Sequence, residues 1–360
     1  MAEAIIEIDQ KVAFRVGLTD DGIYDNIMAT ESARLMLEST PGVEIAPFPV
    51  DAGPVDPKIL DEFDVVLAGG RRVTRESVAG VERCSAIVRF GAGFDTVDLD
   101  VCTDAGIIVA TTPGSVRRSM ATAALTHILA LSTRLFFKSG LVYNGRWREG
   151  STLANVGTGL SGKTIGYLGF GNIGRDLYAL ISPFDMRHLV CDPYLDEATA
   201  GQYDIERVDL PALLSQSDFV VVLCPLGEET RHLIGTEELR QMKPSAYLVN
   251  VARGAIVDQQ ALVRALSAEQ IRGAGLDALD PEPIDPDDPL LALDNVNLTP
   301  HALGITDQMI RLGSELCAES ALDVRRGEAP VSVVNRAVLD SSKLKAKLDA
   351  YRQRYGSATR

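Results

Sequence analysis

Cysteine and positive charge are both scarce in this sequence. The cysteines are odd in number and scattered, show no C-x-x-C pair, and stand at Cys84, Cys102, Cys191, Cys224 and Cys317. This pattern excludes a disulfide framework and a structural zinc site, and it predicts no metal site. Reduced thiols are typical of intracellular proteins, so we expect a cytoplasmic location.

Basic residues are outnumbered by acidic ones. Lysine and arginine together number 35, whereas aspartate and glutamate number 50, which gives a formal net charge of −15. Nucleic-acid-binding domains present a basic surface, so this balance argues against a nucleic-acid partner. An anionic substrate would have to be held by a local basic site against the overall field.

Long apolar runs are absent as well. No window of about 18 residues is apolar throughout and free of charge, so we expect no membrane-spanning helix. The N-terminus MAEAIIEIDQKVAF has neither a basic start nor a long apolar core, and it is not predicted to be a signal peptide. The 360 residues suffice for two domains, and the hydrophobic fraction of 46% is normal for globular proteins.

Short apolar runs alternate with helical patterns in the first third of the chain. The runs are predicted to be buried parallel strands and cover residues 12–18, 63–69, 85–91 and 106–111. Helical spacing between them is found at residues 25–39 and 74–83. A long helix is then predicted from Arg117 to Val142, after a Thr-Pro-Gly-Ser cluster that is typical of a hinge or helix cap.

A second alternating series begins at residue 164. Its six candidate strands are TIGYLGFG, RHLVCD, DFVVVLCP, AYLVNVA, RGAGLDA and NVNLTP. Six strands with intervening helices make a complete doubly wound sheet. Residues 304–327 are again helical in pattern, and the basic tail SSKLKAKLDAYRQRYGSATR is expected to be a solvent-facing helix with a frayed end.

These patterns predict an α/β protein with two doubly wound parallel-sheet domains and a cleft between them. A discontinuous substrate domain would comprise residues 1–111 and 304–345. A nucleotide-binding domain would be inserted at residues 112–303, and residues 346–360 would form the tail. A small substrate would bind in the cleft.

The inserted domain opens with a glycine motif. Gly169, Gly171 and Gly174 form G-x-G-x-x-G between an apolar strand and a helix, which is the context that a dinucleotide site requires. The first glycine permits a tight turn, the second lets the backbone approach a pyrophosphate, and the third lets the helix pack on the strand. Free N–H groups at the start of the helix, from Asn172 and Ile173 onward, would face the phosphates.

Two charged side chains extend this motif. Arg175 would add a charge-assisted contact to the phosphates. Asp192 ends the next strand, 18 residues past Gly174, where an acid accepts hydrogen bonds from the ribose hydroxyls. Its charge would repel a 2′-phosphate, so NAD(H) is predicted in preference to NADP(H). The plainer interpretation is a strand-end turn, for which Asp-Pro is a common pair.

Hydride transfer to a carbonyl also needs a proton donor, and the chain has four histidines. His127 lies in an apolar helical pattern and is expected in the core. His188 begins a strand and is expected to be structural, and His232 is expected at the surface. His301 follows the strand NVNLTP, which places it at a carboxyl strand end, where such sheets bind ligands. His301 is therefore the predicted acid–base group.

A carboxylate would fix the tautomer of this histidine and raise its pKa above the usual value of about 6.5. The segment GLDALDPEPIDPDD offers six acids: Asp277, Asp280, Glu282, Asp285, Asp287 and Asp288. Composition alone does not choose among them, and the last three are expected in a solvated loop. Arg253 raises a similar question, because it directly follows the apolar run AYLVNVA. It is either a solvated loop charge or an anion-binding group at a strand end.

The chain resembles the D-isomer-specific 2-hydroxyacid dehydrogenase family in the order and spacing of six motifs. These are VRFGAGFDTVDL, GYLGFGNIGRDL, CPLGEETRHLIG, MKPSAYLVNVARGAIVD, GLDALDPEPI and LTPHALGIT. The resemblance implies a flavodoxin-like substrate domain, an inserted Rossmann domain that binds NAD(H), and interconversion of a 2-keto acid and a D-2-hydroxy acid. It also implies a homodimer formed through the helix after the hinge.

The resemblance implies residue roles as well. Arg253 matches the arginine that binds the substrate carboxylate, Glu282 the partner of the catalytic histidine, and His301 that histidine. Asp280 is kept as the alternative partner. Backbone N–H groups would hold the substrate carboxylate at Ala92 and Gly93. The further cofactor contacts that the resemblance implies are at Cys224, Pro225, Thr230, Val251, Ala252, Asp277, His301 and Gly304, with Asp277 accepting from the nicotinamide carboxamide.

Three features depart from the family pattern. MAT at residues 120–122 replaces the frequent VAE, which bears on dimer or nicotinamide contacts. AGG at residues 68–70 stands where relatives that act on phosphorylated substrates have an arginine. Arg71 and Arg72 follow it and are possible substitutes, but a phosphate-bearing substrate is less expected. We also expect no regulatory ligand-binding module of the kind found in some serine-pathway relatives.

A second functional hypothesis comes from relatives that are NAD-sensing transcriptional corepressors with slight turnover. They retain the same catalytic residues, so these residues do not separate the two hypotheses. A sensor would couple NADH binding to assembly without turnover, whereas a reductase would oxidise NADH when a 2-keto acid is added. The sequence has no long low-complexity flank of the kind that assembly hubs often carry, which favours the reductase.

Overall fold

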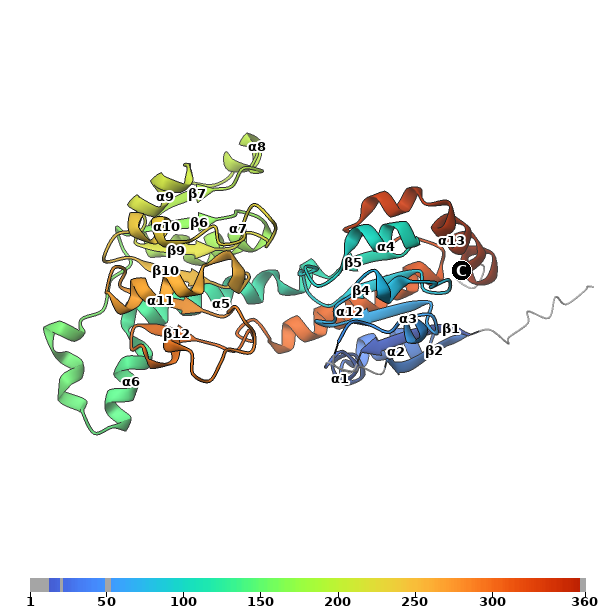
Figure 1. The fold of residues 1–360 in the computed structure, drawn as a ribbon, viewed down its shortest axis with the longest axis horizontal. Coiled ribbons are helices and arrows are strands. Elements are labelled where there is room, and N and C mark those ends of the chain that lie inside the picture. The colour runs from blue at the N-terminus through green and yellow to red at the C-terminus, as the bar shows by residue number, and fades with distance from the viewer. Residues whose placement is uncertain (1–12, 20–21, 49–52, 357–360) are drawn as a thin grey trace, which may run out of the picture. The chain divides into compact units, whose positions relative to one another are not determined.

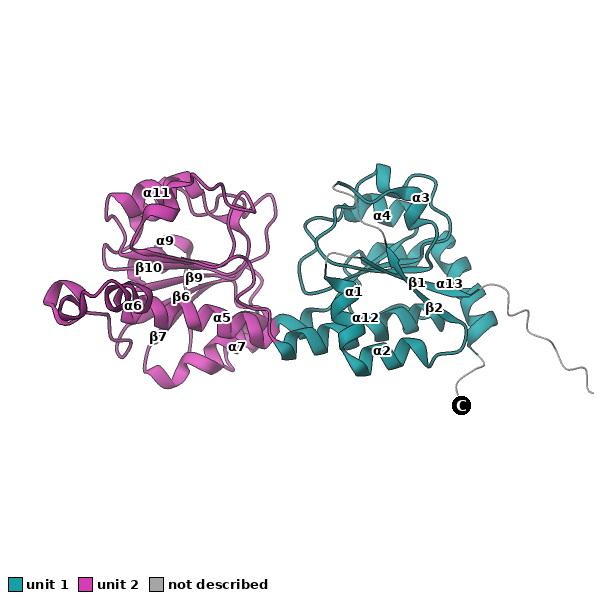
Figure 2. Cartoon of the chain, turned by 90° about the horizontal axis from the view of Figure 1, so that it is seen from below, with its two compact units in different colours: residues 1–116, 307–360 teal, residues 117–306 magenta. Residues whose placement is uncertain are grey.

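The computed structural model describes residues 13–19, 22–48 and 53–356. The segment 1–12, to which the prediction about a signal peptide applies, lies outside the described residues. The chain forms two compact units: residues 1–116 with 307–360 make unit 1, and residues 117–306 make unit 2 (Figure 2). These divisions fall a few residues after the predicted ones: the first lies within the helix Pro113–Thr133, and the second lies where the helix Asp307–Arg325 begins.

Unit 1 is built on a five-stranded parallel sheet in the order β2-β1-β3-β4-β5, the flavodoxin-like order. Its strands are β1 Phe14–Thr19, β2 Val43–Phe48, β3 Val65–Ala68, β4 Ala86–Arg89 and β5 Ile108–Thr111. Side chains alternate between two cores: Val65 and Leu67 enter one, whereas Val66 and Ala68 enter the other. Burial on both faces explains why these strands are apolar throughout.

Helices cover both faces of this sheet (Figure 2). One face carries α1 Ile23–Ala29, α2 Glu31–Glu38 and α12 Asp307–Arg325. The other carries α3 Pro57–Leu60 and α4 Leu99–Ala105. Two short 3₁₀ helices, η1 Glu76–Val78 and η7 Arg336–Asp340, and the last helix, α13 Ser342–Tyr355, complete the unit.

Unit 2 has a seven-stranded parallel sheet in the order β12-β11-β10-β9-β6-β7-β8 (Figure 1). Its strands are β6 Thr164–Leu168, β7 Arg187–Cys191, β8 Glu206–Arg207, β9 Phe219–Val222, β10 Tyr247–Asn250, β11 Gly273–Leu276 and β12 Val296–Leu298. The order reverses between β6 and β9, as in a Rossmann fold, and ligands bind such sheets outside the carboxyl ends of the strands at this point.

The helices of unit 2 again lie on two faces (Figure 2). One face carries α5 Pro113–Thr133 and α7 Asn172–Ile181. The other carries α9 Leu210–Gln216, α10 Thr236–Gln241 and α11 Gln259–Ser267. The remaining elements are α6 Leu135–Tyr143, α8 Glu197–Ala200, and the 3₁₀ helices η2 Trp147–Ser151, η3 Leu153–Asn155, η4 Ser182–Phe184, η5 Gly254–Ile256 and η6 Pro289–Ala292.

The predicted α/β class with two parallel sheets is confirmed, and two edge strands were not predicted. The sequence of β2, VEIAPF, contains a proline and alternates little, because most of its side chains are partly exposed at the sheet edge. Strand β8 is only two residues long, and both residues are exposed. Neither gives the buried apolar run on which the other strands were predicted.

Three helix predictions were wrong in detail. Residues 25–39 are covered by two helices, α1 and α2, rather than one. Residues 74–83 contain only the three-residue η1, because Gly80 takes a left-handed φ of 74° that ends helical structure. The long helix breaks at Arg134, which has a φ of 56° and separates α5 from α6. Among the described residues no single helix is long and apolar enough to cross a membrane, although α5 and α6, bent by 59°, would pass if taken together.

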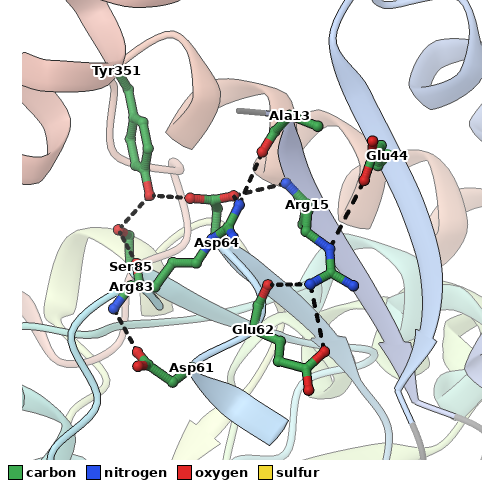
Figure 3. A network of polar contacts seen from close by, with 9 residues as sticks. All are labelled: Ala13, Arg15, Glu44, Asp61, Glu62, Asp64, Arg83, Ser85 and Tyr351. Atoms are coloured by element: carbon green, nitrogen blue, oxygen red, sulfur yellow. Dashed lines mark hydrogen bonds and ion pairs between the residues drawn. The ribbon is translucent and has the colours of Figure 1, made fainter. Parts of the chain in front are cut away.

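The prediction of a solvent-facing tail was also wrong, because α13 packs on unit 1 (Figure 3). Leu344 is fully buried. The Tyr351 hydroxyl donates to Oδ1 of the buried Asp64 at 2.8 Å, and the Arg83 guanidinium donates to Oδ2 at 2.6 Å. The Tyr351 ring also meets the ring of Phe14 edge to face, with centroids 5.3 Å apart. The basic composition of the tail predicted exposure, although one face of the helix is apolar and hydrogen-bonded.

Candidate active site

The carboxyl end of β10 positions Arg253. Asn250, the last residue of this buried strand, turns the chain: its side-chain amide donates to the carbonyl oxygen of Arg253 at 2.9 Å, and its Oδ1 accepts from the N–H of Ala252 at 3.0 Å. The Arg253 guanidinium is partly buried and donates to the carbonyl oxygen of Ala252 at 2.9 Å. The arginine is therefore held at a central strand end and is not an unconstrained loop charge.

Gly254 allows a second segment to approach this turn. A Cβ on Gly254 would collide with the carbonyl group of Leu279. No other residue fits so close a backbone approach. The Arg-Gly pair therefore brings β10 against the segment that carries Glu282, which is a role that sequence reasoning missed, although the pair itself was the signal.

Glu282 and His301 form a direct contact. Glu282 Oε2 lies 2.8 Å from Nδ1 of His301, and Oε1 accepts from the N–H of Leu279 at 2.9 Å. A carboxylate only accepts, so Nδ1 carries the proton and Nε2 is left as the nitrogen that exchanges a proton with a ligand. His301 has a φ of 52°, a left-handed conformation in the turn after β12. Within the described ranges no hydrogen bond joins the alternative Asp280 to His301.

The charges around this pair favour a protonated histidine. The hydrogen bond to Glu282 raises the pKa of His301, and this outweighs the lowering by burial and by the positive charge of Arg253. Burial would raise the pKa of Glu282, but the hydrogen bonds from His301 and from the N–H of Leu279 overcome it and leave that pKa below its usual value. Arg253 acts on both groups, which places its charge near the pair.

Asp277 follows β11 and is almost fully buried, with 2% of its surface exposed. Its Oδ1 accepts from the Thr299 hydroxyl at 2.7 Å and from the N–H groups of Ala302 and Leu303 at 3.1 Å each. The carboxylate thus ties the ends of β11 and β12 together and holds the backbone that follows His301. Thr299 was not predicted as a site residue, and no local motif distinguishes it from other strand-end threonines.

The glycine motif has the geometry of a phosphate-binding turn. Gly169 has a φ of 94°, and a Cβ there would lie 2.9 Å from the backbone nitrogen of Cys224. A Cβ on Gly174 would lie 3.0 Å from the carbonyl oxygen of Gly169, so α7 packs closely on β6. Apart from its neighbours along the chain, no described atom lies within 4 Å of a Cβ built on Gly171, the residue just before α7. The space beside Gly171 and the free N–H groups of Asn172 and Ile173 fit a pyrophosphate.

Asp192 is bound to this turn. The N–H of Phe170 donates to Oδ2 at 2.7 Å, and the N–H of Tyr194 donates to Oδ1 at 2.8 Å. Each oxygen keeps a lone pair with which it can accept from a ribose hydroxyl. Arg175 is anchored by a 3.2 Å hydrogen bond from Nε to the carbonyl oxygen of Phe170. Both charged groups therefore sit at the mouth of the glycine turn.

The remaining predicted cofactor residues lie at the same edge of the sheet. Cys224 and Pro225 follow β9, and the Thr230 hydroxyl donates to the carbonyl oxygen of Pro225 at 2.7 Å. Val251 and Ala252 follow β10, and Val251 is buried. Gly304 lies after β12, where a Cβ would collide with Sδ of Met120. All belong to unit 2.

The predicted substrate loop belongs to unit 1. It follows β4, and Gly91 opens it with a φ of 96° and an N–H that donates to the Thr112 hydroxyl at 2.7 Å. Nε of Arg89 donates to the carbonyl oxygen of Gly93 at 3.4 Å. Among the described residues, the N–H groups of Ala92 and Gly93 donate no hydrogen bond. They are free to bind an anion.

The other histidines behave as predicted. His127 is 1% exposed in the core, and His188 is buried with Nδ1 at 2.9 Å from the Tyr167 hydroxyl. His232 is exposed. Burial lowers the pKa of both His127, to about 4, and His188. Neither of the two buried rings is therefore favoured as a proton donor.

Comparison with known proteins gives consistent similarities. Residues 125–302 match the model of the D-isomer specific 2-hydroxyacid dehydrogenase, NAD binding domain. The chain is 39% identical to a glyoxylate reductase of Korarchaeum cryptofilum over 254 residues, which cover 70% of this chain and 76% of that protein. It is 35% identical to a glyoxylate reductase of Thermococcus litoralis, covering 75% of this chain and 83% of that one.

Solved structures agree with these similarities. The crystal structure of a glyoxylate reductase from Paecilomyes thermophila superposes with a TM-score of 0.77 at 26% identity, and the match covers 89% of this chain and 98% of that chain. The likeness therefore extends over both units rather than over the nucleotide-binding part alone.

Proposed function

The chain belongs to the D-isomer-specific 2-hydroxyacid dehydrogenases, which are NAD-dependent oxidoreductases, and on this premise we propose that it reduces a 2-keto acid to a D-2-hydroxy acid. Arg253, Glu282 and His301 are the proposed catalytic residues. The contact of 2.8 Å between Glu282 and His301, with Arg253 close enough to affect the pKa of both, is the observation that carries the proposal.

His301 is the proposed proton donor. With Nδ1–H held by Glu282, Nε2–H of the imidazolium donates to the carbonyl oxygen of the substrate and transfers its proton as that oxygen gains charge. Glu282 stabilises the imidazolium before transfer and fixes the ring in one tautomer. When bound, the reduced dinucleotide supplies the hydride. In the direction of oxidation, neutral His301 accepts the hydroxyl proton instead.

Arg253 is the proposed substrate anchor. Its planar guanidinium presents paired donors that match a carboxylate and an adjacent carbonyl oxygen. The positive charge also stabilises the oxygen on which negative charge develops. The free N–H groups of Ala92 and Gly93 are the proposed further donors to the substrate carboxylate.

NADH is the proposed cofactor in preference to NADPH. The Asp192 carboxylate, already oriented by the N–H groups of Phe170 and Tyr194, accepts from the ribose hydroxyls. A 2′-phosphate at this position would bring two negative charges together. The proposed role of Arg175 and of the N–H groups of Asn172 and Ile173 is to bind the pyrophosphate.

The names of the relatives suggest glyoxylate as the first substrate to test. The assay follows the absorbance of NADH with purified protein and a panel of 2-keto acids of rising size that starts with glyoxylate. Arg253→Ala removes a charged bidentate contact and is expected to lower kcat/KM about 100-fold, on the scale of ~3 kcal/mol for such contacts. Arg253→Lys retains the charge but loses the paired donors, and it should recover only part of this activity.

Arg231, an exposed arginine of the same unit, provides the control in an Arg231→Ala variant. Turnover by Arg253→Ala at the wild-type rate would contradict the assignment of this arginine. Tight NADH binding by the wild type with no oxidation across the panel would favour the sensor hypothesis over the reductase.

A homodimer is the proposed assembly. The segment from α6 to η3 exposes large apolar side chains, and the most exposed are Tyr143 at 89%, Trp147 at 75% and Leu153 at 92%. A contiguous exposed apolar segment of this kind is typical of a protein–protein interface. Light scattering should give the mass of a dimer for the wild type and a monomer for a Trp147→Ser, Leu153→Ser variant. A monomeric wild type would refute the proposal.

A further inference from the structure

A buried histidine stands behind the site in a helix that is otherwise apolar on that face. His127 of α5 is 1% exposed, and its ring packs on β11 at Gly275, where a Cβ would lie only 2.7 Å from Nδ1. Burying an imidazole N–H without a partner is costly, so a histidine in this position requires a hydrogen bond. Its partner is the Thr299 hydroxyl, with Nε2 and Oγ1 3.4 Å apart.

The direction of each hydrogen bond follows from the proton count. The Thr299 hydroxyl has one proton, and its shortest contact, 2.7 Å, is with the carboxylate oxygen Oδ1 of Asp277, which only accepts. The hydroxyl oxygen must therefore accept from His127. This makes His127 a neutral imidazole with its proton on Nε2. Burial lowers the pKa of His127 to about 4, which is consistent with a neutral ring.

The chain of hydrogen bonds ends on the carboxylate that holds the loop of the catalytic histidine. Oδ1 of Asp277 accepts from Thr299 and from the N–H groups of Ala302 and Leu303, the two residues after His301. Within the described part of the chain, no hydrogen bond reaches the other oxygen, Oδ2. One oxygen is thus saturated by the protein, and the other remains for a ligand.

We propose that His127 and Thr299 are positioning residues that fix the rotamer of Asp277, so that Oδ2 accepts from the carboxamide of the nicotinamide. This inference rests on the proposed function, which places that end of the cofactor beside Asp277. The residues act through Asp277 and touch neither substrate nor cofactor. Without the donor on His127, the Thr299 hydroxyl is free to turn to the carbonyl oxygen of Leu276, which lies 3.5 Å from Oγ1.

The proposal predicts a selective loss of affinity for the nicotinamide end of the cofactor. Calorimetry measures the Kd of NADH and of ADP-ribose, which lacks the nicotinamide, for wild type, His127→Leu, His127→Gln and Thr299→Val. His127→Leu should weaken NADH about fivefold and Thr299→Val about tenfold or more, the scale of one neutral and one charged hydrogen bond. ADP-ribose should bind all four proteins equally.

His127→Gln tests the hydrogen bond itself, because its side-chain amide restores a donor. It should bring the Kd of NADH back to within about twofold of wild type, a difference smaller than one hydrogen bond. Thr126→Val is the matched control: within the described residues, the Thr126 hydroxyl of the same helix bonds only to the carbonyl oxygen of Thr122, at 2.8 Å. This control should bind both ligands as the wild type does.

Two outcomes would overturn the proposal. Equal weakening of NADH and ADP-ribose would show a general packing role, and unchanged NADH affinity in both His127→Leu and Thr299→Val would show no role. If His127→Leu fails to fold, the affinities of His127→Gln and Thr299→Val for NADH and ADP-ribose still test the proposal. The binding experiment does not depend on turnover. A wild type that binds NADH but reduces no 2-keto acid would contradict the proposed reaction, and the ratio of the Kd values of NADH and ADP-ribose would still test the roles of His127 and Thr299.

Discussion

Replacement of Glu282 by glutamine tests the acid–base pair most sharply. The substitution keeps the shape of the side chain and removes its charge. In the wild type, Glu282 holds the pKa of His301 above its usual value, so the protonated form persists as the pH rises and reduction is lost only as the pH passes the raised pKa. Without the carboxylate, only the charge of Asp277 still opposes the lowering by burial and by Arg253, so the pKa of His301 falls and the alkaline limb of the profile moves to lower pH.

The size of the effect follows from the contact. A charged hydrogen bond contributes about 1.5–3 kcal/mol. The side chains of His301 and Glu282 are 38% and 39% exposed, so solvent screening applies. With this screening, the contribution of the hydrogen bond between Glu282 and His301 is about 1–2 kcal/mol. In mildly alkaline buffer this corresponds to a loss of about 5- to 30-fold in kcat/KM, and the loss should narrow in acidic buffer, where His301 is protonated in both proteins.

The assay is the pH profile of kcat/KM for reduction of a 2-keto acid by NADH. Asp287→Asn is the matched control, because it removes one negative charge from the same acidic segment at an exposed position. The control should keep the alkaline limb of the wild type. An unchanged limb in Glu282→Gln, or an equal displacement in Asp287→Asn, would refute the reasoning that the Glu282 contact sets the pKa of His301.

Three further predictions concern the cofactor site and the fold. Asp192→Ser should lower the preference for NADH over NADPH about 10- to 100-fold, the scale of ~1–3 kcal/mol for one charge contact, and equal preference before and after would refute its role. Gly169→Ala should weaken NADH binding more than about tenfold, because Gly169 has a left-handed φ and its Cβ would lie 2.9 Å from the backbone nitrogen of Cys224. Gly171→Ala should keep the melting temperature of the wild type, because a Cβ has space there, but it should bind NADH less tightly. Tyr351→Phe should lower the free energy of unfolding in urea by about 1–2 kcal/mol, because the buried Asp64 loses a donor, and an unchanged midpoint would show that α13 does not contribute through this bond.

Central features of the fold were predictable from the sequence because they depend on local patterns. Buried parallel strands are apolar on both faces, so β6, β9 and β10 are visible as continuous runs. The edge strand β2 lacks such a run, since its side chains are partly exposed. The docking of α13 was not predictable because it depends on Tyr351 meeting Asp64, which is 287 residues away in the sequence.

The site residues likewise include some that local patterns indicate and others that depend on tertiary packing. His301 and Asp192 are marked by their places at strand ends, which a sequence shows directly. The partner of His301 was not chosen by pattern: six acids compete, and only the resemblance favoured Glu282. The geometry selects Glu282, because its Oε2 lies 2.8 Å from Nδ1 of His301. The hydrogen bonds of His127 and Thr299 depend on the packing of α5 against β11 and β12, which no local pattern encodes.

The most direct test of the central claim is the identity of the product formed from NADH and a prochiral 2-keto acid such as pyruvate or phenylpyruvate. Chiral chromatography of the reaction with the wild-type protein should give the D-2-hydroxy acid, with one molecule of product for each NADH oxidised. An L-2-hydroxy acid, or NADH binding without any hydroxy acid from the whole panel, would contradict the account.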